Sequence, residues 1–203
     1  MKISKNRIEY FSDAIIAIII TIMVLDIPLP KEFKLNEILV LFHAIFVFFV
    51  SFIVVASQWN KHRYLFDNIK EITNKIIWRN FLFLFFLALL PIFTKWIIEN
   101  PGQVVPAIGY EIIFLLLNFS YQFIWVDVVK EDVEFESDKS KMKIEENNFL
   151  HRFIMMIIAV VAITLLSISY PTISLILFLA LPVTMSLFNL IYENDRHHHI
   201  KHD

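Results

Sequence analysis

The chain has 203 residues and a formal net charge of −2, and 58% of its residues are hydrophobic, including 21 phenylalanines. A soluble domain is usually about 45–50% apolar, so this composition excludes an ordinary soluble protein. The chain has no cysteine, which excludes a disulfide framework and a thiolate metal site. The apolar residues gather into runs of about 20, the length of a membrane-spanning helix, and therefore predict a polytopic membrane protein.

Six apolar stretches are long enough to cross a bilayer as helices. We expect them at about residues 8–27, 38–56, 80–98, 104–126, 149–169 and 172–191. The second is expected to continue past Trp59, and Pro91 lies within the third. The predicted fold class is therefore all-α, with residues 1–203 forming a single six-helix transmembrane domain.

The positive residues predict the orientation of these helices. With the N-terminus inside, 15 of the 18 Lys and Arg residues fall on the inner side, and only Lys31, Lys34 and Lys95 fall outside. This bias predicts that both termini are cytoplasmic. Residues 127–148 would form a charged cytoplasmic loop whose mixed signs are typical of a solvated connection. The tail at 196–203 holds four histidines, which in a flexible segment offer only weak chelation.

The first predicted helix has two chemically different sides. Ile18, Ile22 and Leu25 recur at helical spacing and form one apolar stripe, which Thr21 borders. Asp13 is turned about 140° from Ile18 around an ideal helix. A carboxylate inside a membrane is costly, so Asp13 should have a partner. Periodicity alone favours packing of the apolar stripe against other helices.

The start of this helix carries a distinctive motif. Arg7, Phe11, Ser12 and Asp13 form R-x-x-x-F-S-D, and A-I-I-I-T follows at residues 17–21. This stretch resembles the signature of the lysosomal potassium channel family (transmembrane protein 175 type) and of its single-repeat prokaryotic relatives. A second similarity is the Trp-x-x-His element that ends the second span, formed here by Trp59 and His62. Animal members of that family carry two six-helix repeats, whereas this chain carries one.

The resemblance implies a function for the apolar stripe. In the family this helix lines a central pore, which makes Ile18 the principal constriction and Thr21 a ring of hydroxyl groups. Ile22 and Leu25 would continue the constriction outward as a hydrophobic gate. The chain would then be a potassium-permeable channel without enzyme activity or cofactor, with permeating K⁺ as its only metal ion. It would be a multi-pass protein of a prokaryotic plasma membrane. One such helix cannot enclose a path, so the pore must come from symmetric assembly, and the resemblance implies a homotetramer.

A ring of isoleucines can favour potassium because it cannot replace a hydration shell, and potassium loses less than sodium when it sheds water. Hydroxyl oxygens of Thr21 would offset part of that loss, and a tight aliphatic ring can also close by dewetting. The carbonyl filter of conventional potassium channels needs a T-V-G-Y-G loop. The two glycines here, Gly102 and Gly109, stand apart, so such a filter is excluded.

A second group of residues is polar and lies near the predicted cytoplasmic ends of the first three spans. We interpret it as a clamp that holds the first helix by hydrogen bonds. Its members are Arg7, Phe11, Ser12, Asp13, Trp59, His62 and Asn80. A proton relay through Asp13 and His62 is the alternative interpretation. Arg7 is ambiguous, because a straight helix places it near the stripe although it could bend towards Asp13.

Isolated polar residues are weaker signals. His43 and Glu111 would form a pH-sensitive pair if they met, and Asn118 and Ser120 are expected to bridge helices. Signatures of hydrolases, phosphate-binding loops and nucleic-acid-binding folds are missing. Two other functions stay open: a proton channel or proton-coupled transporter, and a membrane scaffold subunit without transport of its own. The lipid bilayer is the expected environment for all three.

Overall fold

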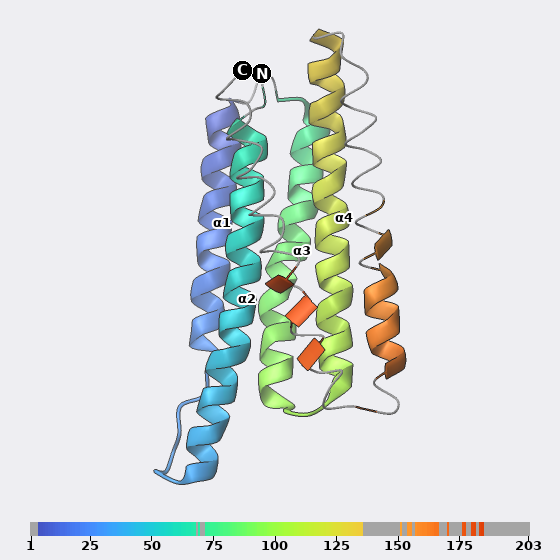
Figure 1. The fold of residues 1–203 in the computed structure, drawn as a ribbon. Helices are drawn as coiled ribbons and strands as arrows, with labels where there is room; N and C mark the ends of the chain where they lie inside the picture. Colours follow the sequence, from blue (N-terminus) through green and yellow to red (C-terminus); the bar gives the residue numbers. More distant parts are fainter. Residues whose placement is uncertain are drawn as a thin grey trace, which may run out of the picture.

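The structure is a computed structural model that describes residues 4–135 except 68, 70 and 71, and then 151, 154–155, 157–166, 170, 176–177, 180–181 and 183–184. Across this part of the chain the regular structure is entirely helical. Four long helices dominate it (Figure 1), namely α1 (Lys5–Leu25), α2 (Leu35–Asp67), α3 (Asn74–Glu99) and α4 (Val104–Phe135).

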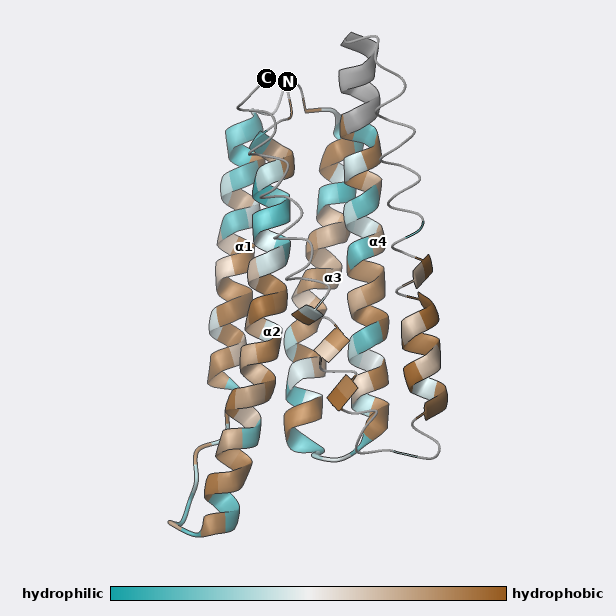
Figure 2. Ribbon diagram, in the orientation of Figure 1, coloured by the Kyte–Doolittle hydropathy of each residue, from teal (hydrophilic) through white to brown (hydrophobic). Residues whose placement is uncertain are grey.

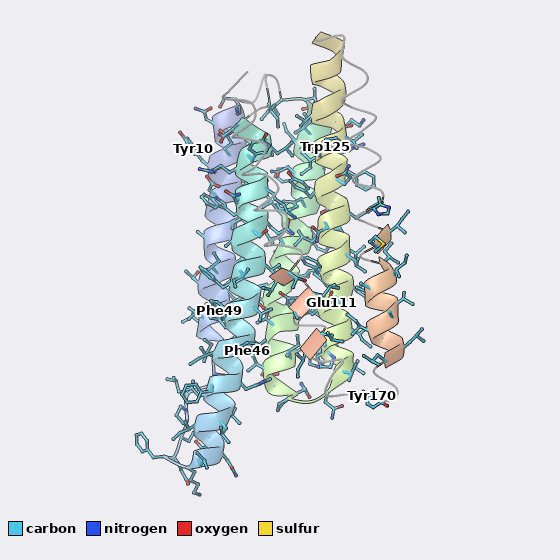
Figure 3. All side chains as sticks on the ribbon, viewed as in Figure 1. Tyr10, Phe46, Phe49, Glu111, Trp125 and Tyr170 are labelled. Carbon is cyan, nitrogen blue, oxygen red and sulfur yellow. The ribbon has the colours of Figure 1, made fainter. Side chains whose placement is uncertain are left out.

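The four helices run up and down, so that α1 and α3 begin at the end of the bundle where α2 and α4 finish (Figure 1). The helix α3 contacts the other three, and α1 packs against α2 and α3. Side chains such as Met23, Val54 and Leu87 are fully buried between them. Hydrophilic residues gather at the end where α1 begins, and apolar residues cover the middle of the helices (Figure 2). Phe46 and Phe49 are exposed on the outside of α2 (Figure 3), as suits contact with lipid.

Local sequence explains how the helices start and turn. Thr73 caps α3, because its side chain accepts a hydrogen bond from the backbone N–H of Ile76. Gly102, between α3 and α4, has a φ of 82°, which favours glycine. Gly109 lets α4 approach α3 closely, since an added Cβ would lie 2.7 Å from a ring carbon of Phe93.

All four helices are long and apolar enough to span a membrane. They correspond to the first four predicted spans, and α2 continues past Trp59 as expected. The predicted fourth span, 104–126, agrees with the membrane-spanning part of α4, Val104–Val128, but the helix itself runs to Phe135, so residues 127–135, predicted as loop, are helical. This segment contains neither glycine nor proline, and Val128 and Asp127 are buried within it, which keeps the helix intact.

The C-terminal predictions are only partly covered. Residues 157–166 form an apolar helix inside the predicted fifth span. The remainder of the charged loop, at 136–148, and the histidine-rich tail lie outside the described residues, as does most of the sixth span.

Two cations on α3 hold the C-terminal part of α4. The Asp127 carboxylate is buried, and its oxygens lie 2.8 Å from the Lys75 ammonium and 2.9 Å from the Arg79 guanidinium. Arg79 also donates a hydrogen bond to the backbone carbonyl of Phe123. These contacts tie the end of α4 to the start of α3.

Asp127→Asn is expected to lower the free energy of unfolding by about 1–3 kcal/mol. The substitution leaves two cations without their buried counter-charge, although the half-exposed Lys75 moderates the loss. Denaturant unfolding of the protein in detergent measures this change. Asp67→Asn, at the exposed end of α2, is the matched control and should stay close to the wild type. Equal effects of both substitutions would contradict the structural role of Asp127.

Candidate functional site

The buried face of α1 anchors this helix within its own protomer. Its residues recur every three or four positions and pack against α2 and α3. They are Ile8, Ser12, Ile16, Ile19 and Met23. This packing fixes the rotation of α1 about its own axis and therefore the direction in which its opposite face points.

The opposite face presents the predicted stripe. Ile18 is 55% exposed, Ile22 46% and Leu25 83%, and Thr21 is exposed beside them. None of the four side chains belongs to the protomer's core. The Thr21 hydroxyl donates a 2.8 Å hydrogen bond to the Ile18 carbonyl, which leaves the oxygen lone pairs of Thr21 as acceptors. The stripe is therefore an apolar surface with one row of hydroxyl oxygens.

Helical spacing extends this surface towards the start of α1. Arg7, Phe11 and Ala14 precede Ile18 at intervals of four, three and four residues, and all three are exposed. Arg7 makes no side-chain hydrogen bond or ion pair within the described residues, so it does not reach Asp13. Phe11 also packs edge-to-face on Phe81 of α3, with ring centroids 5.7 Å apart.

A buried hydrogen-bond chain joins α1, α2 and α3. The side-chain amide of Asn80 donates to the Ser12 hydroxyl at 2.9 Å, and Ser12 in turn donates to the Ile8 carbonyl at 2.8 Å. The Asn80 carbonyl oxygen lies 2.8 Å from His62 Nε2, which donates in the tautomer that satisfies both groups. His62 is stacked between the rings of Phe66 and Phe83.

Asp13 has a partner of its own on α2. The indole N–H of Trp59 donates to the Asp13 carboxylate at 2.9 Å, at an exposed position. Of the residues predicted to form the clamp, Ser12, Asp13, Trp59, His62 and Asn80 are thus brought into two neighbouring contacts, whereas Arg7 is not. Each contact ties α1 to a different neighbouring helix.

Sequence patterns missed further polar contacts. Ser51 of α2 and Thr94 of α3 share a 2.8 Å hydrogen bond, and Asn118 accepts from Gln58 and Lys61, both at 3.3 Å. Asn118 therefore bridges helices as predicted. Within the described residues the Ser120 hydroxyl bonds only to the Leu117 carbonyl of its own helix, so the bridge predicted for Ser120 is not seen there. Spacing within one helix cannot reveal such partners.

The isolated ionisable groups do not pair. His43 Nε2 and both carboxylate oxygens of Glu111 are buried without a hydrogen-bond partner, so these two residues do not form the pH-sensitive pair. The described residues also contain no group of three or more His, Asp or Glu side chains placed to hold a metal ion.

These features define a class: an integral membrane protein of antiparallel helices, in which one helix is packed and hydrogen-bonded on one side and presents an exposed apolar stripe on the other. The chain belongs to the TMEM175 family. The sequence profile described as "Endosomal/lysosomal potassium channel TMEM175" matches residues 7–91. These residues include the motif, α2 and much of α3.

Individual relatives agree with this assignment. A protein of Chryseobacterium sp. (strain P1-3) named a potassium channel is 31% identical over 172 residues, which are 85% of this chain and 87% of that one. The crystal structure of a lysosomal potassium-selective channel TMEM175 homolog from Chamaesiphon minutus matches with a TM-score of 0.65 and 23% identity. That match covers 90% of this chain and 96% of the other, and it shows a shared fold. A Bos taurus relative, named an endosomal/lysosomal proton channel, is 25% identical, and the match covers 73% of this chain and 34% of the bovine one.

Proposed function

We propose that this protein is a potassium-permeable cation channel whose ion path runs along the exposed stripe of α1. The observation that carries the proposal is the exposure of Ile18, Thr21, Ile22 and Leu25 on a helix whose opposite face is buried. Bacterial relatives named potassium channels support the same function. The protein would act by letting ions pass and would catalyse no reaction.

The channel is a symmetric homo-oligomer, with four copies of α1 around a shared axis. A single exposed stripe cannot enclose a path, whereas closed symmetry lets equivalent residues form rings. Each protomer spans the plasma membrane of a prokaryote six times, with both termini in the cytoplasm. The distribution of Lys and Arg in the sequence and the up-and-down course of the first four helices support this topology.

Selectivity arises where the stripe narrows the path. Rings of Ile18, Ile22 and Leu25 strip or squeeze the hydration shell, which costs sodium more than potassium. The Thr21 oxygen offsets part of this cost, because its hydrogen is already donated to the Ile18 carbonyl and its lone pairs can face a cation. The clamp of Asn80, Ser12 and His62 keeps α1 in the rotation that presents the stripe.

Reversal potentials in planar bilayers test the proposal. With potassium on one side and sodium on the other, the purified protein should give currents whose reversal potential shows a preference for potassium. Native mass measurements on the same sample should give four copies. A protein that carries no ion flux would instead be a scaffold subunit, and the channel proposal would fail.

Proton transport is a second candidate, favoured by the name of the bovine relative and by an Asp and a His near the start of the path. The hydrogen bonds of the structure favour a clamp instead. They link Asn80 to Ser12 and His62 within one level of the bundle, and Asp13 bonds separately to Trp59. A relay needs proton carriers that continue across the membrane.

Asp13→Asn separates the two interpretations. Asparagine cannot titrate but keeps the carbonyl oxygen that accepts from Trp59, so a clamp predicts wild-type-like assembly and ion flux. Asp13→Ala removes the acceptor and should lower stability by about 1 kcal/mol, with loss of assembled protein. Flux assays under separate potassium and proton gradients measure the outcome. Loss of a proton-driven current in Asp13→Asn alone would support the relay.

A further inference from the structure

Glu111 is a carboxylic acid inside a membrane-spanning helix, and neither the stripe nor the clamp uses it. Its side chain is 0% exposed, and neither carboxyl oxygen has a hydrogen-bond partner. Figure 3 labels Glu111 in the lower half of α4, on the part of the helix that spans the membrane. A buried carboxylate without a hydrogen-bond partner is energetically costly, so the protonation state of Glu111 needs an explanation.

The described residues that pack on this face of α4 are mainly apolar. Ala107 and Leu115, one turn before and after it on the same face of α4, belong to an apolar cluster with Val160 of the helix at 157–166. Ile163 and Leu181 pack against the same cluster. Glu111 therefore lies in the seam between α4 and the C-terminal helical segments.

The described part of that seam offers no counter-charge. The sequence at 157–166 and at 172–191 contains no Asp, Glu, Lys, Arg or His. The lysines of the neighbouring helices have other partners. The Lys95 ammonium of α3 lies 3.0 Å from the carboxylate of Asp26, and Lys61 of α2 donates a hydrogen bond to Asn118. Glu99 is exposed at the end of α3.

Two further ionisable residues of the membrane-spanning helices are Tyr110 on α4 and His43 on α2. Tyr110 is buried and His43 is partly buried, and the Tyr110 hydroxyl and His43 Nε2 are buried atoms that likewise have no hydrogen-bond partner. Tyr110 belongs to the core formed with α1, α2 and α3, about 100° around the helix from Glu111. Neither residue supplies a positive charge bonded to the carboxyl group.

We propose that Glu111 is a proton-binding site between α4 and the helix at 157–166, separate from the ion path. The protonated, neutral carboxyl fits the apolar seam, whereas the carboxylate requires water or a cation and separates the two helices. Proton release from Glu111 therefore loosens this packing as the pH rises, and proton binding restores it. The inference does not depend on which ion the channel conducts.

Infrared spectroscopy of the full-length protein in liposomes tests the protonation state directly. The difference spectrum between wild type and Glu111→Gln at neutral pH should contain the C=O band of one protonated carboxyl group. The matched control, Glu99→Gln, should remove only an ionised carboxylate band. If Glu111→Gln removes an ionised carboxylate band and no protonated C=O band, Glu111 is ionised and the proposal is overturned.

Thermal unfolding as a function of pH tests the packing. The unfolding midpoint of the wild type should fall from neutral to alkaline pH, and Glu111→Gln should remove that part of the fall. Glu111→Met, which fills the same space without ionising, should behave like Glu111→Gln. An unchanged pH dependence in both variants would overturn the proposal, as would failure of both to fold, since a neutral side chain would then be insufficient. Neither measurement uses ion flux, so the result is independent of the proposed channel function.

Discussion

Replacing Ile18 with alanine is expected to raise potassium flux about tenfold, because removing about 1.4 kcal/mol from a barrier has that effect on a rate. The shorter side chain widens the narrowest ring, so ions keep more of their hydration water. Sodium gains more from this than potassium, and the preference for potassium should fall. Single-channel conductance and reversal potentials, measured on the same preparation, give both quantities.

Ile19→Ala is the control for this substitution. Ile19 follows Ile18 directly but is buried against the neighbouring helices, so its truncation should destabilise the protomer by about 2–5 kcal/mol without changing selectivity. If Ile18→Ala leaves both conductance and selectivity unchanged, Ile18 does not form the constriction.

Replacing Asn80 with alanine is expected to destabilise the fold by about 2–5 kcal/mol. One substitution removes the partners of both Ser12 and His62, and each buried group left unpaired costs about 1–3 kcal/mol. The Ser12 side chain of α1 loses its hydrogen bond to α3, so the rotation of α1 about its own axis is no longer fixed. We therefore expect fewer assembled channels and lower flux per milligram of protein.

Denaturant unfolding measures the loss of stability in Asn80→Ala, and native mass measurements give the amount of assembled channel. Asn36→Ala, in the exposed first turn of α2, is the matched control and should remain within about 0.5 kcal/mol of the wild type, as exposed substitutions usually do. Wild-type stability of Asn80→Ala would contradict the clamp.

Several structural features follow from the sequence because they depend on local patterns. The four long apolar helices follow from runs of hydrophobic residues, and the helical spacing of Ile18, Ile22 and Leu25 places them on one face of α1. That this face is exposed did not follow from the spacing, which favoured packing; it was expected only from the resemblance to the channel family. The need of Asp13 for a partner follows from the cost of a carboxylate in a membrane, and Trp59 meets that need. Each of these inferences uses only the sequence of a single helix.

Other features could not be read from the sequence because they depend on tertiary packing. The attachment of the C-terminal part of α4 involves Asp127, which is paired with two cations of α3 about 50 residues earlier in the chain. The described residues show Ser120 bonded to its own helix and not to another, because a hydroxyl can also bond to a nearby carbonyl of the same helix. The isolation of Glu111 depends on the apolar residues that cover it, which no pattern within α4 indicates.

The most direct test of the ion path places single cysteines along α1, since the chain contains none of its own. Ile22 and Val24 are each 46% exposed, yet they point about 160° apart around the helix. A water-soluble thiol reagent should block potassium flux through Ile18→Cys and Ile22→Cys channels and leave Val24→Cys channels unaffected. Equal block of the Ile22→Cys and Val24→Cys channels, or no block of any of them, would contradict a path lined by this stripe.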